Sequence, residues 1–123
     1  CVKDVDKKNI FELSKELMEL SMKARNKKLI PEDLKGSSFT ISSLGGIGGT
    51  AFSPIVNPPE VAIMGVSRSE WSPVFNRESK GFEPKYLMPF SLSYDHRVID
   101  GAAAATFTSH INKVLLKSEN FTK

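Results

Sequence analysis

The sequence predicts a protein of the α/β or α+β class, with a mixed sheet and flanking helices. Three observations predict this class: apolar residues at helical spacing near the start, short alternating segments in the middle, and an alanine-rich helical pattern near the end. A chain of 123 residues has the length of one domain with one modest core. We therefore expect layers of sheet and helix around that core.

The first helix is predicted from Lys7 to about Lys28. Its apolar residues recur at intervals of three and four, at Ile10, Leu13, Leu17, Leu20 and Ala24. Asp6 is the predicted N-cap, because a carboxylate before the first turn accepts hydrogen bonds from free backbone N–H groups. Pro31 then opens a short helical turn that Gly36 ends.

Three strands are predicted at Ser37–Leu44, Val61–Val66 and Leu87–Tyr94. The segment from Ser67 to Pro84 is rich in serine, proline, glycine and charge, which favours a loop or a hairpin with an exposed tip around residues 77–81. The least usual residues therefore follow strand ends, where proteins of this class commonly keep their functional sites.

The last helix is predicted from near Asp100 to about Lys117, with Ala104, Phe107, Ile111, Val114 and Leu115 on one face. The glycine-rich segment after the first strand formally fits a relaxed dinucleotide fingerprint at Gly46, Gly48 and Ala51. Prolines follow it where that fingerprint requires a helix. We therefore predict a tight connection in which glycine supplies positive φ or a close backbone approach.

Composition excludes several classes of function. The 17 basic and 14 acidic side chains are spread along the chain, so the net charge of +3 predicts neither a nucleic-acid partner nor a membrane surface. No apolar run approaches the ~20 residues of a membrane span. Cys1 is the only cysteine, which excludes an internal disulfide and suits a reducing cytoplasm.

The chain lacks an initiator methionine and begins within an ordered pattern, so we expect that its start was cut from a longer protein.

The sequence predicts no metal site. His96 and His110 are fourteen residues apart on different predicted elements, and neither has a cysteine partner.

The segment DHRVIDG, residues 95–101, is the strongest candidate for chemistry. His96 follows a strand, Asp100 can cap the next helix, and Gly101 is expected to relieve crowding at the junction. A general base needs such a fixed position, because its usefulness depends first on geometry. The alternative is that His96 and Arg97 only satisfy backbone carbonyls, with Asp95 and Asp100 as local caps. The residues alone leave both interpretations open.

SYDHRVIDGAAAA resembles the HxxxDG signature of the dihydrolipoyl acyltransferases of 2-oxo acid dehydrogenase complexes and of the related chloramphenicol acetyltransferases. The segment KARNKKLIPEDLKGSSFTISSLGGIGGTAFSPIVNPPEVAIMGVS is also similar to that family, so the resemblance covers nearly the whole chain. It implies a CoA-dependent, chloramphenicol acetyltransferase-like fold. It also implies that residues 1–123 are a partial domain, the C-terminal half of the catalytic domain.

The resemblance also implies roles for single residues. His96 would be the general base that takes the proton from a thiol, and Ser42 would donate a hydrogen bond to the oxyanion. Ser43 competes for the second role, although strand alternation points it to the opposite face. Asp100 would orient the bend and the imidazole. Structural support of the site would come from three further residues, Asp95, Arg97 and Gly101.

Three segments are most similar to the acetyl-transferring branch of bacterial pyruvate dehydrogenase complexes: ISSLGG, FSPIVNPPEVAI and SLSYDHRVIDG. The succinyl and branched-chain branches of the family share the HxxxDG signature. The resemblance implies coenzyme A as co-substrate, a lipoyl group on a separate domain, and no metal. Implied partners are lipoyl domains and the pyruvate dehydrogenase and dihydrolipoamide dehydrogenase components. A non-catalytic assembly fragment and transfer to another acyl acceptor remain as alternatives.

In that family the active site lies between subunits of a homotrimer, and trimers build a larger symmetric core. The resemblance therefore implies that His96 of one chain faces Ser42 of its neighbour. We also expect the strands of this chain to expose unpaired edges.

Overall fold

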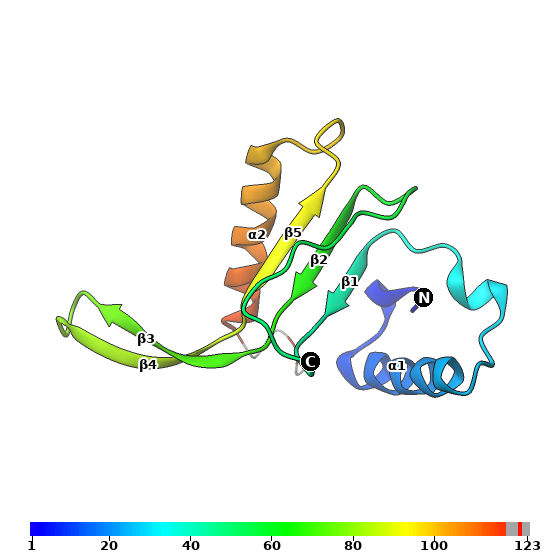
Figure 1. Cartoon of the computed structure of the whole chain (residues 1–123), viewed down its shortest axis with the longest axis horizontal. Helices are drawn as coiled ribbons and strands as arrows, with labels where there is room; N and C mark the ends of the chain where they lie inside the picture. Colours follow the sequence, from blue (N-terminus) through cyan, green and yellow to red (C-terminus); the bar gives the residue numbers. More distant parts are fainter. Residues whose placement is uncertain (118–120, 122–123) are drawn as a thin grey trace. The chain divides into compact units, whose positions relative to one another are not determined.

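The computed structural model of the chain describes residues 1–117 and 121. The chain forms two compact units. The helical unit combines residues 1–38 with residues from 105 onward, and the sheet unit comprises residues 39–104. Along the chain the order is a helix, five strands and a helix (Figure 1), which confirms the predicted mixture of helix and sheet.

The first helix of the helical unit, α1, spans Ile10–Arg25 and is shorter at both ends than the sequence predicts. Its N-cap is Asn9, whose side chain accepts hydrogen bonds from the backbone N–H groups of Phe11 and Glu12 at 3.0 Å. Glu12 in turn accepts from the Asn9 N–H at 2.9 Å, which completes a capping box. The prediction of Asp6 as N-cap is wrong, because Asp6 lies in a separate 3₁₀ turn, Val5–Lys7.

The apolar stripe of α1 is present but exposed. None of the residues of α1 is buried. Leu13 and Leu20 are half-buried, whereas Phe11 retains 79% of its accessible surface. Local signals, the capping box and the basic residues of the last turn, therefore define the ends of this helix. The predicted turn at Pro31 is confirmed as a 3₁₀ helix, Pro31–Leu34.

The sheet unit is built on three strands in the order β1-β2-β5. They are β1 (Thr40–Ser43), β2 (Ala62–Val66) and β5 (Phe90–Tyr94). β1 runs parallel to β2, and β5 runs antiparallel to it, so the sheet is mixed as predicted. The central strand is the most buried, with Ala62 at 6% and Ile63 at 7% exposure. In the described chain β1 and β5 each keep one unpaired edge.

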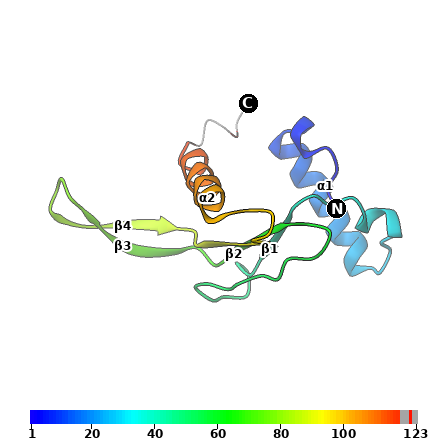
Figure 2. The same cartoon turned by 90° about the horizontal axis from the view of Figure 1, so that it is seen from above.

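The two faces of this sheet carry different residues of the sheet unit. Residues 44–61 run beneath one face in Figure 2. They include Gly48 and Gly49, whose positive φ angles of 123° and 97° confirm the expected glycine connection. The other face carries Tyr94, and α2 (Gly101–Leu115) begins beside that ring. Among the described residues, no helix is both long enough and apolar enough to cross a membrane.

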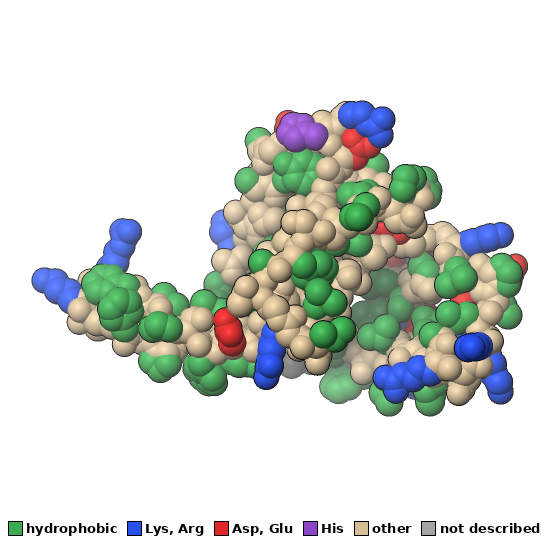
Figure 3. Space-filling model, viewed as in Figure 1, with side chains coloured by type: hydrophobic (Ala, Val, Ile, Leu, Met, Phe, Trp, Pro, Cys, Tyr) green, Lys and Arg blue, Asp and Glu red, His purple; other side chains and the backbone are tan. Residues whose placement is uncertain are grey.

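The segment after β2 forms a hairpin of β3 (Glu70–Asn76) and β4 (Gly81–Leu87), which confirms the hairpin and its tip. One of its faces carries two aromatic pairs, the tilted pair Trp71–Tyr86 and the edge-to-face pair Phe75–Phe82, with ring centroids 5.3 and 5.5 Å apart. Hydrophobic side chains are visible along this hairpin in Figure 3. Leu87 ends β4 and Pro89 separates it from β5, so the single strand predicted from Leu87 to Tyr94 is divided.

Candidate active site

His96 lies in a tight bend at the end of β5. The bend begins where the Asp95 N–H donates to the carbonyl of Val61 at 2.8 Å. The Asp95 carbonyl then accepts from the N–H groups of both Val98 and Ile99 at 3.0 Å. These bonds fix the backbone on both sides of His96 to a single carbonyl and to the neighbouring strand.

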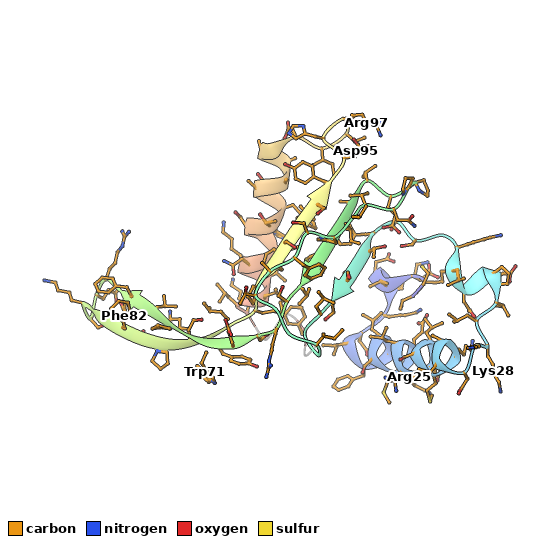
Figure 4. All side chains as sticks on the ribbon, in the orientation of Figure 1. Arg25, Lys28, Trp71, Phe82, Asp95 and Arg97 are labelled. Atoms are coloured by element: carbon orange, nitrogen blue, oxygen red, sulfur yellow. The ribbon has the colours of Figure 1, made fainter. Side chains whose placement is uncertain are left out.

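A bidentate ion pair closes the outside of the same bend. The Arg97 guanidinium donates from Nε to Asp95 Oδ1 at 2.9 Å and from Nη2 to Asp95 Oδ2 at 2.6 Å, and the Arg97 N–H adds a bond of 3.0 Å to Oδ1. The two side chains lie together at the end of β5 in Figure 4. The hydrogen bonds from Arg97 lower the pKa of Asp95 from 3.8 to about 2, and Asp95 raises the pKa of Arg97. The ion pair expected from the sequence is present.

Asp100 ends the bend and starts α2. Its carboxylate accepts from the N–H of Ala103 at 2.7 Å, and its carbonyl accepts from the N–H of Ala104 at 3.1 Å. Asp100 is therefore the N-cap of α2, as the sequence predicts. Apart from its chain neighbours and its own helix backbone, the nearest atom to a Cβ added at Gly101 would be Tyr94 Oη at 4.0 Å, an ordinary van der Waals distance, and the role of Gly101 in relieving crowding stays a prediction.

The His96 side chain itself is exposed. The closest described aromatic ring is that of Tyr94, whose centroid lies 5.7 Å from the imidazole centroid at an interplanar angle of 40°. Tyr94 was not singled out in the sequence; its position two residues before His96 on an alternating strand was the available signal. An exposed imidazole on a rigid bend can accept a proton from a group that approaches from outside the chain.

Ser42 lies on β1, at the other edge of the sheet. It pairs with Gly65 of β2, which in turn pairs with Ser91 of β5, so the three residues form one row across one face. Ser42 is half-buried, and its hydroxyl has no hydrogen-bond partner within the described residues. Ser43 points to the opposite face, where its hydroxyl accepts from the Gly45 N–H at 3.4 Å.

Within one chain the structure does not bring His96 and Ser42 together. Ser42 pairs with Gly65, whereas Tyr94, two residues before His96, pairs with Ala62, three residues earlier on β2. Three residues of strand and two strand spacings place the Cα atoms of Ser42 and Tyr94 about 14 Å apart. The side chains of Ser42 and Tyr94 also belong to opposite faces of the sheet.

Other features of the sheet unit carry no predicted site residue. An open hollow of about 540 Å³ lies at the base of the hairpin. It is lined by Gly48, Gly49, Thr50, Arg68, Ser69, Glu70, Trp71 and Tyr86. Among the described residues no group of three or more His, Cys, Asp or Glu side chains is placed to hold a metal ion.

Residues 1–122 match the model of the 2-oxoacid dehydrogenases acyltransferase (catalytic domain). The chain belongs to this acyltransferase family. Over 113 residues it is 60% identical to the dihydrolipoyllysine-residue acetyltransferase component of the pyruvate dehydrogenase complex of Haemophilus influenzae. That match covers 92% of this chain and 20% of the relative, so the chain spans about a fifth of the length of this curated acyltransferase.

Solved acyltransferase cores share the fold. The Azotobacter vinelandii dihydrolipoamide acetyltransferase matches with a TM-score of 0.88 and 55% identity, over 93% of this chain and 46% of that one. The cubic core of the pyruvate dehydrogenase multienzyme complex matches with a TM-score of 0.87 and 55% identity, over 91% and 45%. The predicted fold, a mixed sheet with flanking helices in a partial acyltransferase domain, is confirmed.

The Azotobacter vinelandii work concerned the role of a serine, a histidine and an asparagine in the catalytic mechanism of that acetyltransferase. The histidine and the asparagine are four positions apart there. His96 and Asp100 are also four positions apart, with an aspartate as the second residue.

Proposed function

We propose that the whole protein containing this chain transfers an acetyl group between dihydrolipoamide and coenzyme A in a pyruvate dehydrogenase complex. The observation that carries this proposal is the presence of two suitable side chains, His96 and Ser42, in a chain so similar to acetyltransferases. One is an imidazole on a hydrogen-bonded bend, and the other is a half-buried serine hydroxyl without a partner.

The chemistry follows from these two groups. His96 accepts the proton of a substrate thiol, because a free thiol with a pKa near ~8.5 is mostly protonated at neutral pH. The sulfur then attacks the carbonyl carbon of the thioester, and Ser42 donates a hydrogen bond to the oxyanion that forms. The C–S bond of the original thioester breaks, and the departing thiolate takes the proton back from His96. No acyl-enzyme forms, because thiol and thioester react directly.

Asp100 acts on His96 through the backbone. Its carboxylate caps α2 and so fixes the end of the bend that carries the imidazole. An asparagine can cap a helix in the same way, and the Azotobacter vinelandii acetyltransferase has a mechanistically studied asparagine four positions after its histidine. Asp100 therefore serves as a positioning residue that exchanges no proton. Asp95 and Arg97 hold the outer side of the bend.

The reaction requires partners that this chain does not supply. Coenzyme A and dihydrolipoamide are the substrates, with the lipoyl group delivered by a separate lipoyl domain. The pyruvate dehydrogenase and dihydrolipoamide dehydrogenase components are proposed as further partners, in line with the complex to which the curated relatives belong. The cytoplasmic location expected from the sequence stays a prediction.

The separation of the two positions in one chain supports a site that forms between two subunits. Tyr94, two residues before His96, lies about 14 Å from Ser42 between Cα atoms, on the opposite face of the sheet. A second copy can supply the missing group, and the cubic core among the similar structures is a symmetric assembly in which subunits meet. We propose a homotrimer in which His96 of one subunit faces Ser42 of the next.

Complementation tests this proposal in the whole protein. His96→Ala and Ser42→Ala variants are each expected to lose acetyl transfer, measured with acetyl-CoA and dihydrolipoamide. When the two variants are co-expressed, random mixing leaves one intact site in each mixed trimer, so about a quarter of the wild-type activity should return. Each variant expressed alone is the control.

Two outcomes would contradict the proposal. If mixed trimers form but activity does not return, the site lies within one subunit. If either variant alone keeps near-normal activity, the mechanism is wrong and the alternative of a non-catalytic assembly module gains support. Parallel assays with succinyl-CoA and branched-chain acyl-CoA test the other acyl groups.

A further inference from the structure

The backbone around His96 is fixed by hydrogen bonds, but its imidazole is not. The Asp95 carbonyl accepts from the N–H groups of Val98 and Ile99 at 3.0 Å. The Asp95 N–H donates to the carbonyl of Val61 at 2.8 Å. Within the described residues, the exposed His96 side chain has no hydrogen-bond or ion-pair partner. Packing alone can therefore restrict its side-chain torsions in this chain, and the outer torsion of a histidine is intrinsically broad.

The ring of Tyr94 packs near this imidazole. The two ring centroids are 5.7 Å apart, and the ring planes are inclined by 40°. This separation lies inside the range of about 4.5–7 Å over which two aromatic rings attract each other. Tyr94 is half-buried, whereas His96 is exposed. The contact therefore joins the exposed imidazole to a more buried ring of the sheet.

The position of the Tyr94 ring is set by both ends of the bend. Tyr94 pairs with Ala62 of the central strand, and Ala62 is only 6% exposed. The Tyr94 hydroxyl oxygen lies 4.0 Å from the place that a Cβ on Gly101 would occupy, beside the first residue of α2. The ring thus extends from the end of β5 to the start of α2, which Asp100 caps. It is a fixed surface next to which the imidazole can settle.

We propose that Tyr94 is a positioning residue whose ring holds the His96 imidazole in the orientation that accepts the thiol proton. This inference rests on the proposed function, in which His96 is the general base. A general base must come within about 2.6–3.2 Å of the heavy atom that carries the proton. A misplacement of about 1 Å can cost up to about 100-fold in rate. Because the ring makes the contact, a phenylalanine should serve in place of Tyr94.

Replacement of Tyr94 in the whole protein tests the inference, with kcat and KM measured for acetyl-CoA and dihydrolipoamide. Tyr94→Leu removes the ring and should lower kcat about 3–10-fold, the effect expected of one aromatic contact. Both KM values should stay within about twofold, because the ring orients the base and does not bind the substrates. Tyr94→Phe keeps the ring and should keep kcat within about twofold of the wild type. Tyr94→Met also lacks the ring and fills space flexibly, so it keeps the test valid if Tyr94→Leu does not fold.

Phe90→Leu is the matched control, because Phe90 is a half-buried aromatic residue on the same strand and the same face as Tyr94. Four residues of strand place the two Cα atoms about 13 Å apart. Loss of the Phe90 ring should therefore change kcat by less than about twofold. Equal losses of kcat in Phe90→Leu and Tyr94→Leu would overturn the inference. So would a Tyr94→Phe variant as slow as Tyr94→Leu, or an unchanged kcat in a folded variant without the ring.

A double variant separates an action through His96 from a general effect on the sheet. In His96→Ala the imidazole is absent, so the addition of Tyr94→Leu should leave the residual kcat unchanged within about twofold. A further loss as large as that of Tyr94→Leu alone would overturn the inference.

His96→Ala alone separates this inference from the proposed function. If His96→Ala lowers kcat while Tyr94→Leu leaves it unchanged, only the role of Tyr94 is wrong. If His96→Ala keeps near-normal activity, the proposed function itself fails, whatever the Tyr94 variants show.

Discussion

The two edges of the three-stranded sheet are built in opposite ways. At the end of β5, hydrogen bonds of Asp95, Val98 and Ile99 and the ion pair of Asp95 with Arg97 hold the backbone around His96, while the imidazole itself is exposed. On β1, the strand is short and its outer edge unpaired, while Ser42 is half-buried and its hydroxyl has no hydrogen-bond partner among the described residues. The β5 edge therefore exposes the His96 imidazole on a hydrogen-bonded bend, and the β1 edge carries the half-buried Ser42 hydroxyl.

Under the proposed function, this difference explains why both edges are needed. A base must reach the reacting thiol, so it has to project, whereas an oxyanion donor works best where water is excluded. The register of β2 places the Ser42 row and Tyr94, two residues before His96, three residues apart and on opposite faces of the sheet. The proposal therefore requires that the two groups meet across a contact between chains.

The largest expected effect comes from His96. His96→Ala in the whole protein should lower kcat for acetyl transfer by about 10²–10⁴-fold, because the thiol loses its general base. His110→Ala is the matched control, since His110 is an exposed histidine on α2 and should leave kcat within about twofold. Equal losses in the two variants would remove the distinction between the two histidines.

The effect of Ser42 should be next in size. Ser42→Ala removes one oxyanion donor and should lower kcat about 10²–10³-fold with little change in KM. Ser43→Ala removes the same atom from the opposite face of the next residue and should keep most of the activity. If Ser43→Ala is the more damaging change, the assignment of faces along β1 has to be reversed.

A smaller effect is expected at the cap of α2. Asp100→Ala leaves the Ala103 N–H without its acceptor and should lower the free energy of unfolding by about 1 kcal/mol, measured by denaturant titration. Asp100→Asn keeps a capping oxygen and should stay within a few tenths of a kcal/mol. An asparagine variant as unstable as the alanine variant would show that the charge, and not the cap, supports the bend.

The smallest effect concerns the ion pair beside His96. The pKa of Asp95 should be found at about 2 by NMR titration of its carboxyl carbon, because Arg97 binds the carboxylate. Arg97→Gln should return it towards 3.8. Since the folded pKa is depressed, the stabilisation from this pair is present above about pH 4 and is lost as the pH falls towards 2. An unchanged pKa in Arg97→Gln would assign the shift to another cause.

The sequence predicted the parts of this site that depend on local chemistry. Helical spacing predicted both long helices, and the position of Asp100 before an alanine run predicted its cap. The pair of Asp95 and Arg97 also follows from proximity in sequence. The cap at Asn9 was missed although its pattern, an asparagine three residues before a glutamate, was present; an acidic residue nearer the expected start competed with it.

The features that depend on contacts between distant segments could not be predicted from residue patterns. Periodicity marks a strand but gives neither its direction nor its neighbour, so the separation of Ser42 from Tyr94 became visible only in the register of the sheet. The close approach of the Phe52 ring to Gly65 of β2 likewise joins residues thirteen positions apart in the chain. The break at Pro89 was hidden because apolar residues continue on both sides of it.

The aromatic pair of Trp71 and Tyr86 on the hairpin has a practical consequence for measurement. Trp71 is the only tryptophan of the chain, and 69% of its surface is exposed. Indole emission therefore reports on the solvent around β3 and β4 and is nearly silent about the row that holds Ser42. A fluorescence change would signal that something has covered the hairpin, and a label on β1 would be needed to observe the side of the sheet that carries Ser42.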